Sequence, residues 1–211
     1  HTAWMLDAGG DAIVAVNTVT GTRVVLANDY SSGGTDNFSS PSNVAYDSNG
    51  NRLLIIDYNQ DRLVAINLAS GTLSVVSDNT IAGGDADFQS PRGLAFDPAN
   101  NRALVTDSVG DCVFGVNLST GYRTVLSDDE STGADFQTPR GIAYDDAANA
   151  VYVVDSGKDA LIHVDLATGT RTYISNSGSN GTSFKTPEDL AIDISAGEAY
   201  VADSGLNAIL A

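Results

Sequence analysis

The chain repeats one pattern at a step of 48 to 50 residues along its 211 residues. Each copy carries an Asp that closes a short apolar run, followed at fixed distances by a Gly, a Phe and a Pro. These recurring residues are Asp7, Asp57, Asp107, Asp155 and Asp203; Gly21, Gly71, Gly121 and Gly169; Phe38, Phe88, Phe136 and Phe184; and Pro41, Pro91, Pro139 and Pro187. A fixed period of this length indicates a repeat architecture. Residues that recur are therefore expected to build the repeat, and residues that break the pattern are candidates for function.

One copy of the repeat, residues 91–128, contains four short apolar runs. They read PRGLAFD, RALVTD, CVFGVNL and RTVLSD, and the turns PANN, SVGD and STGY separate them. Short β-branched runs punctuated by Gly, Asn, Asp and Pro are typical of strands joined by hairpins. No segment shows helical spacing over ten residues. Four antiparallel strands per repeat predict an all-β fold, a β-propeller with sheets around a central channel. A linear solenoid is the alternative.

The phase of the repeat predicts about four and a half blades within a single propeller region, 1–211. Residues 1–6 align with 101–106, so the chain opens at a second strand, and its last residues lie inside a third strand. The expected units are a partial blade at 1–29, blades at about 42–78, 92–128 and 140–175, and a partial blade at 188–211. We expect a segment of a longer ring. The alternative is closure by pairing the ends, or pairing with a second copy.

Two recurring features are interpreted as structural. The Asp after each second run is followed four residues later by another Asp or an Asn, and such short polar side chains bond turn backbone N–H groups. We prefer this capping role to metal binding. The recurring Phe is expected to pack between neighbouring sheets.

Composition excludes several classes of partner. Twenty-seven Asp and Glu stand against 10 Lys and Arg, a net charge of −17, so phosphate backbones and anionic membrane surfaces would be repelled. No run approaches the ~20 apolar residues of a membrane helix. The acidity predicts a soluble protein in an extracellular or periplasmic setting, with Ca²⁺ as a possible ligand. Cys112, the single cysteine, lies in an apolar run and is expected to be a buried, inert thiol.

A motif in the repeat resembles a known family of propellers. It reads P-x-G-[LI]-A-[FY]-D followed by [VL]-x-D-S, and it occurs as Pro91–Asp97 with Val105–Ser108 and as Pro139–Asp145 with Val153–Ser156. This pattern resembles NHL-repeat propellers and the related gluconolactonase (senescence-marker-protein) family of six-bladed type. The NHL resemblance implies binding of proteins or other ligands on one face of the ring, in many cases without chemistry.

The gluconolactonase resemblance implies a metal-dependent hydrolase. In that family some ligands of a catalytic divalent metal are Asn or Asp at the position between the Pro and the Gly. Here that column reads Ser42, Arg92, Arg140 and Glu188. Two positions carry a cation where a metal needs an oxygen donor. Glu188, with neighbouring Asp189 or Asn43, is the remaining metal candidate.

The same column is the best candidate for a binding site. First strands line the channel of a propeller, so these side chains are expected to converge at one mouth. The candidate residues are Ser42, Asn43, Arg92, Arg140, Glu188 and Asp189. Two guanidinium groups and a carboxylate would bind an anionic or polar ligand through charge-assisted hydrogen bonds. The alternative is that they pair with one another as a structural network.

The sequence leaves three functions open. A non-catalytic recognition or scaffold propeller, binding a protein or a small polar ligand, is favoured because no nucleophile motif is present. A metal-dependent lactonase and an assembly subunit that uses open blade edges are the alternatives. His163 stands where other copies carry Ala or Gly, and we interpret it as a packing or surface residue rather than a general base.

Overall fold

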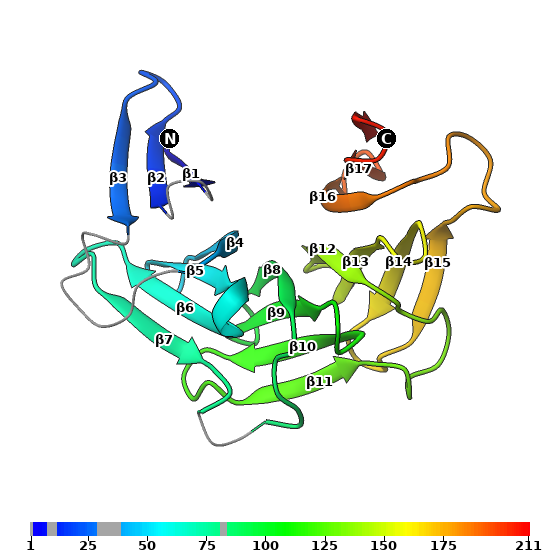
Figure 1. Cartoon of the computed structure of the whole chain (residues 1–211), viewed down its shortest axis with the longest axis horizontal. Helices are drawn as coiled ribbons and strands as arrows, with labels where there is room; N and C mark the ends of the chain where they lie inside the picture. Colours follow the sequence, from blue (N-terminus) through cyan, green and yellow to red (C-terminus); the bar gives the residue numbers. More distant parts are fainter. Residues whose placement is uncertain (1, 8–11, 29–38, 81–83) are drawn as a thin grey trace.

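The protein is described here by a computed structural model that places residues 2–7, 12–28, 39–80 and 84–211. This part of the chain forms eighteen strands and a single 3₁₀ turn, η1 (Tyr58–Gln60), grouped into five antiparallel sheets. Figure 1 shows the sheets following one another along an arc, with β4, β8, β12 and β16 toward its centre and β7, β11 and β15 at its outer side. The all-β propeller expected from the repeat is confirmed.

The five sheets contain three, four, four, four and three strands, which is the order that the repeat predicts. The first sheet contains β1 (Thr2–Asp7), β2 (Ala12–Asn17) and β3 (Arg23–Asn28). The second contains β4 (Pro41–Asp47), β5 (Arg52–Asp57), β6 (Arg62–Asn67) and β7 (Leu73–Ser77). The third contains β8 (Pro91–Asp97), β9 (Arg102–Asp107), β10 (Cys112–Asn117) and β11 (Arg123–Ser127). The fourth contains β12 (Pro139–Asp145), β13 (Ala150–Asp155), β14 (Ala160–Asp165) and β15 (Arg171–Ser175). The fifth contains β16 (Pro187–Asp193), β17 (Glu198–Asp203) and β18 (Ala208–Leu210).

The hairpins form because the sequence supplies residues that tolerate a left-handed backbone at each tight turn. Gly71 and Gly121 have φ of 71° and 74° in the turns before the outer strands. Glycine adopts this conformation without a steric penalty. Asn117 ends the preceding strand, and its side-chain oxygen accepts hydrogen bonds from the backbone N–H groups of Ser119 and Thr120 at 2.9 and 3.1 Å. Local turn chemistry therefore fixes the length of each strand.

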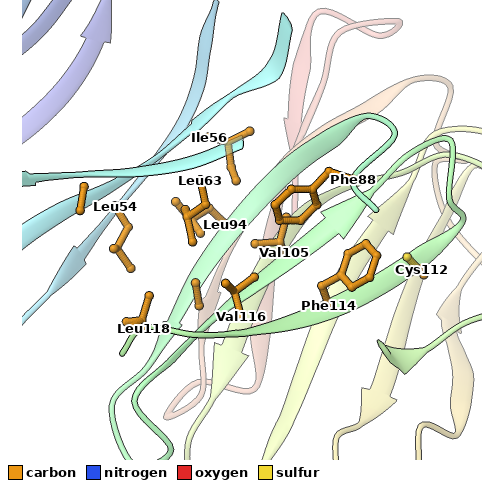
Figure 2. Packing of buried hydrophobic residues seen from close by; sticks show 12 residues of the cluster. Leu54, Ile56, Leu63, Phe88, Leu94, Val105, Cys112, Phe114, Val116 and Leu118 are labelled. Atoms are coloured by element: carbon orange, nitrogen blue, oxygen red, sulfur yellow. The ribbon is translucent and has the colours of Figure 1, made fainter. Parts of the chain in front are cut away.

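The core lies between neighbouring sheets rather than within one of them. Figure 2 shows Leu54 and Ile56 of the second sheet facing Val105 and Phe114 of the third, with Phe88 from the connecting loop between them. Phe88 is 2% exposed and meets Phe114 edge-on, with 5.4 Å between the ring centroids. An edge-on aromatic pair of this kind stabilises the fold by about 1 kcal/mol beyond the contribution of the apolar area that it buries. The inter-sheet core is what orients each sheet against the next.

The recurring Phe residues have the predicted packing role where the structure describes them. Phe136 is 3% exposed in the equivalent core between the third and fourth sheets. Phe184 is only partly buried, against the smaller cluster between the fourth and fifth sheets. Phe38 lies outside the described residues.

The Asp that ends the second strand accepts backbone N–H hydrogen bonds in the second to fifth sheets, as expected, whereas Asp111 and Asp159, four residues later, each have a buried side-chain oxygen without a partner in the described chain. Asp107 accepts hydrogen bonds from the backbone N–H groups of Gln89 and Ser90, at 2.7 and 2.9 Å, and of Val109 and Gly110, at 3.2 and 2.9 Å. A single buried carboxylate thus joins the loop that enters the sheet to the hairpin that follows the second strand. The carboxylates of Asp57, Asp155 and Asp203 accept hydrogen bonds from backbone N–H groups of the equivalent loops. This contact positions the proline that begins each inner strand.

Cys112 and His163, which the sequence singled out, both pack against other side chains of the sheets. Cys112 is buried, and burial raises the pKa of its thiol well above the ordinary value, which keeps it protonated and unreactive. His163 is partly buried and packs edge-on against Tyr152, with 5.3 Å between the rings. None of the described segments forms a helix of the length and apolarity that crossing a membrane requires.

Candidate functional site

The inner strands β4, β8, β12 and β16 lie side by side and begin at the same end of the channel. Their second and third residues line one hollow of about 210 Å³, called the channel mouth below. Its lining residues are Ser42, Asn43, Arg92, Gly93, Arg140, Gly141, Glu188 and Asp189. All six residues selected from the sequence are therefore brought together. Ligand binding by them stays a prediction.

An irregularity at the start of each inner strand directs these side chains. The pairing register between β8 and β9 shifts between Pro91 and Leu94, and the register between β12 and β13 shifts between Pro139 and Ile142. A bulge locally turns the strand and re-aims the side chains within it. The residues in question, Arg92 and Arg140, consequently leave the regular alternation of the sheet and face the channel mouth.

Two glycines let the inner strands approach closely. A Cβ on Gly93 would collide with the backbone carbonyl of Arg140, and a Cβ on Gly141 would collide with the backbone of Asp189. The Thr106 hydroxyl accepts a hydrogen bond from the Gly93 N–H at 2.8 Å and donates one to the Arg140 carbonyl. Neighbouring strands are thereby locked at a separation that packs the side chains of the channel mouth against one another.

Arg140 and Glu188 form an ion pair across the boundary between the fourth and fifth sheets. The Arg140 Nη1 donates to the Glu188 Oε2, and its Nε donates to the Ser156 Oγ at 2.9 Å. The other Glu188 oxygen accepts from the Ser204 hydroxyl at 3.2 Å. Because the two charges already compensate each other, Arg140 and Glu188 form a structural network, which is the alternative to ligand binding at these two residues.

Arg92 is in a different electrostatic situation. Its guanidinium lies over the ring of Tyr58, 3.7 Å from the centroid, and its Nε is buried without a hydrogen-bond partner. Among the residues that the structure describes, no carboxylate lies within ion-pair distance of Arg92. Stacking on an aromatic face holds the guanidinium in place without neutralising it. The channel mouth therefore contains a positioned cation with unused donors.

Asp189 is the second unusual group of the channel mouth. Burial raises the pKa of its carboxyl above the ordinary value, and the hydrogen bond from the Leu190 N–H at 2.9 Å opposes this only in part. The residue nevertheless stays exposed to solvent, so the shift comes from partial desolvation of the carboxyl and not from enclosure in the core.

The sequence offers Glu188 and Asp189 as candidates for binding a metal ion. In the described ranges, no group of three or more His, Cys, Asp or Glu side chains is placed to hold a metal ion. Glu188 uses both oxygens for Arg140 and Ser204. A Ca²⁺ ion at these residues stays a prediction.

Sequence reasoning missed Tyr58, the platform beneath Arg92. The signal was present, because the residue after the strand-ending Asp is Ser108, Ser156 and Ser204 in the later copies and a tyrosine only in the second sheet. The same serine column also supplies the partners of Arg140 and Glu188. A break in a repeated column therefore marked a residue of the channel mouth.

Comparison with known proteins identifies the fold and no family. No known family model matches the sequence, and no curated protein matches it. Solved structures do match. A chain of the nidogen/laminin complex superposes with a TM-score of 0.72 at 16% identity, covering 100% of this chain and 74% of that one.

Two bacterial structures match with somewhat lower TM-scores. An auxiliary nutrient binding protein from Bacteroides ovatus gives a TM-score of 0.67 at 15% identity, over 98% of this chain and 57% of its own. Virginiamycin B lyase from Staphylococcus aureus gives a TM-score of 0.66 at 14% identity, and the match covers 99% of this chain and 61% of the lyase chain. At these identities the likeness shows the β-propeller fold alone. The five sheets make a partial ring relative to these six-bladed structures, and the NHL and gluconolactonase resemblance stays a prediction.

Proposed function

We propose that this propeller is a non-catalytic recognition domain that binds a carboxylate-bearing ligand at the channel mouth. The observation that carries the proposal is the Arg92 guanidinium, stacked on Tyr58 and free of any carboxylate partner in the described chain. In a protein with a net charge of −17, a cation left without a counterion at the mouth is the feature that attracts an anion.

The size of the hollow limits what enters it. A volume of about 210 Å³ is smaller than the ~300–1,000 Å³ typical of pockets that enclose a whole small molecule. It suits one acidic group with its neighbouring atoms. The ligand is thus an Asp or Glu side chain on a protein surface, or a small organic acid. Arg92 pairs with one carboxylate oxygen through its fork of donors, and Asn43 and Ser42 supply neutral hydrogen bonds.

The comparisons support this proposal without testing it. One similar propeller belongs to a complex of two proteins, and another is named for nutrient binding. The alternatives drawn from the sequence, a lactonase of gluconolactonase type and an assembly subunit, stay open. So does the expected extracellular or periplasmic location.

Titration with small dicarboxylates and with an acidic peptide tests the proposal. Isothermal calorimetry of the whole chain with succinate, glutarate and a Glu-rich peptide is expected to detect saturable binding. Arg92→Met is expected to weaken it roughly tenfold to hundredfold, because a hydrogen-bonded charge pair contributes about 1.5–3 kcal/mol. Arg23→Met, at an exposed arginine of the first sheet, is the matched control and should bind as the parent does.

Two results would contradict the proposal. One is equal affinity of the parent and Arg92→Met for every acid that binds. The other is turnover of lactones or esters that is lost on changing Glu188 or Arg140, which would favour the hydrolase.

A further inference from the structure

Two positions at which the second sheet departs from the repeat lie beside Arg92 of the third sheet. One is Tyr58, which stands in a column of serines and lies beneath the Arg92 guanidinium. The other is Asn43, which stands where the third and fourth sheets have Gly93 and Gly141. Asn43 and Arg92 line the same hollow at the channel mouth. Two independent breaks in the repeat therefore meet at one arginine.

The third residue of an inner strand is directed at the inner strand of the following sheet. A Cβ on Gly93 would collide with the Arg140 carbonyl on β12, and a Cβ on Gly141 would collide with the backbone of β16. For Asn43, the third residue of β4, the following inner strand is β8, which carries Arg92 as its second residue. β4 and β8 lie side by side (Figure 1), so the surroundings of Asn43 are set by two strands that the structure describes.

The backbone of Asn43 is held in the regular ladder of its sheet. β4 resumes its pairing with β5 at Asn43, which lies opposite Ile56, whereas β8 resumes its pairing with β9 only at Leu94. Asn43 is also partly buried. A paired strand residue has a side chain of fixed direction, so the Asn43 amide is positioned before any ligand arrives.

The polar groups on this side of the channel mouth have unused hydrogen-bonding capacity. Within the described ranges, the Asn43 amide and the Ser42 hydroxyl have no hydrogen-bond partner, and no carboxylate pairs with Arg92. On the other side, Arg140 and Glu188 are paired with each other. An arginine only donates, whereas an amide and a hydroxyl both donate and accept. The corner formed by Ser42, Asn43 and Arg92, called the Arg92 corner below, thus combines a cation with neutral acceptors.

A carboxylate alone would leave the acceptors of the Arg92 corner unused. The carboxylate oxygens match the guanidinium donors, but the Asn43 Oδ1 can bond only an N–H or O–H group. The acceptors there are neutral, and the acidic residues of the channel mouth, Glu188 and Asp189, lie two inner strands away on β16. A neutral hydroxyl is therefore favoured over an ammonium group, which would enter without a counterion.

The size of the hollow determines where the ligand carries this hydroxyl. A volume of about 210 Å³ holds one acidic group with its neighbouring atoms, so the hydroxyl belongs on the carbon next to the carboxyl carbon. In an inference that rests on the proposed function of this site, we propose that the Arg92 corner binds an α-hydroxy carboxylic acid. Its carboxylate pairs with Arg92, its hydroxyl donates to the Asn43 Oδ1, and the Ser42 hydroxyl donates to a second ligand oxygen.

Titration of the 211-residue chain with matched pairs of acids tests the proposal. The pairs are malate with succinate and lactate with propionate, which differ only by the hydroxyl. Amide chemical shifts in heteronuclear NMR spectra measure the dissociation constants. Each hydroxy acid is expected to bind roughly three- to tenfold more tightly than its partner, the effect of one net hydrogen bond. Aspartate and alanine, in which an ammonium replaces the hydroxyl, are expected to bind no more tightly than succinate and propionate.

Substitutions at position 43 assign the preference for a hydroxyl to the Asn43 amide. Asn43→Gly introduces the residue that the third and fourth sheets carry at this position, so the fold should be kept. Asn43→Leu keeps a side chain of similar size and removes both hydrogen-bonding groups. In each variant the ratio of the malate affinity to the succinate affinity should fall to about one. Thr124→Leu, at an exposed position of the outer strand β11, is the control in which the ratio should be that of the parent.

Arg92→Met separates this inference from the proposed function. It should weaken malate and succinate together, whereas the Asn43 variants change the ratio of their affinities. Equal affinity of the parent for malate and succinate, with both lost in Arg92→Met, overturns the α-hydroxy acid and leaves the carboxylate site intact. Failure of every acid to bind overturns both.

Three further outcomes would also overturn the α-hydroxy acid as the ligand. Tighter binding of aspartate than of malate would indicate an amino acid. Tighter binding of a Glu-rich peptide than of any small acid would indicate a protein partner. A preference for malate that survives both Asn43→Gly and Asn43→Leu would show that the amide does not recognise the hydroxyl.

Discussion

At the scale of single residues, the stability of the fold depends on carboxylates that differ in burial and hydrogen bonding. Asp107 is fully buried and serves four backbone N–H groups. Asp111, four residues later, has a left-handed backbone with φ of 47° and one buried oxygen without a partner in the described chain. The sequence shows the pair but not this difference, because both residues are short acids in a turn.

Replacing Asp107 by alanine is expected to destabilise the fold severely. Four N–H groups lose their acceptor inside the protein, and buried unsatisfied donors cost about 1–3 kcal/mol each before relaxation. We expect a loss of about 3 kcal/mol or more in urea unfolding. Asp193→Ala is the matched control, since Asp193 caps an exposed turn where water replaces the carboxylate. Equal losses of unfolding free energy in the two variants would refute the role of Asp107 in joining the entering loop to the hairpin.

Asp111 gives a pH-dependent prediction. Burial, followed by the charges of Asp129, Asp155 and Asp107, raises its pKa to about 6 from 3.8. The folded state then binds the proton more tightly than the unfolded chain, so the contribution of Asp111 to stability falls as the pH rises from about 4 to about 6 and stays low above that range. Asn tolerates the left-handed backbone, and Asn207 occupies the equivalent turn of the fifth sheet.

The variant Asp111→Asn is therefore expected to be more stable than the parent above about pH 6. The gain is on the order of 1 kcal/mol after allowance for solvent screening. The difference should shrink to near zero below about pH 4. Urea unfolding at several pH values measures it, and a gain that is constant with pH would show that the charge is not its cause.

At the scale of elements, loops between sheets have the most specific geometry. The loops 128–138 and 176–186 share their hydrogen bonds and a left-handed glycine, yet one encloses an arginine and the other opens onto a cavity. Strand and hairpin positions follow from local turn chemistry, which is why they were predictable. The loop 128–138 is covered by Arg171, which begins the outer strand of the same sheet, so the cover comes from a strand more than thirty residues later in the sequence.

Alanine at the two equivalent glycines should separate backbone strain from collision. Gly133→Ala carries both the strain of positive φ and the clash with Arg171, so a loss above about 3 kcal/mol is expected. Gly181→Ala carries the strain alone, about 1–2 kcal/mol. Thermal or urea unfolding compares them. Similar losses would mean that the open space at Gly181 is filled in solution.

At the scale of the whole molecule, the sheets are stabilised by their neighbours. Counted over the described residues, the clusters that join the second sheet to the third and the third to the fourth each contain twelve buried residues, whereas the cluster at the fifth sheet contains three. In repeat architectures stability is close to a sum of such nearest-neighbour interfaces. The arc in Figure 1 is therefore expected to be most stable at its middle.

Native-state hydrogen exchange should follow this gradient. Amides of β9, β10, β13 and β14 are expected to exchange slowest, and those of β1–β3 and β16–β18 fastest, because local opening needs less apolar surface to be exposed at the end sheets. Mass spectrometry of peptic fragments measures the order. Uniform protection across all five sheets would instead indicate one cooperative unit.

The sequence by itself determined the strands, the hairpins, the order of the sheets and the column of residues at the channel mouth. These follow from a period of alternating side chains and from turn residues that act on their own backbone. Only the tertiary structure decided that Arg140 is neutralised by Glu188 and that Arg92 rests on Tyr58. Each of these depends on side chains from different strands meeting across a distance that is set by the packing of one sheet on the next.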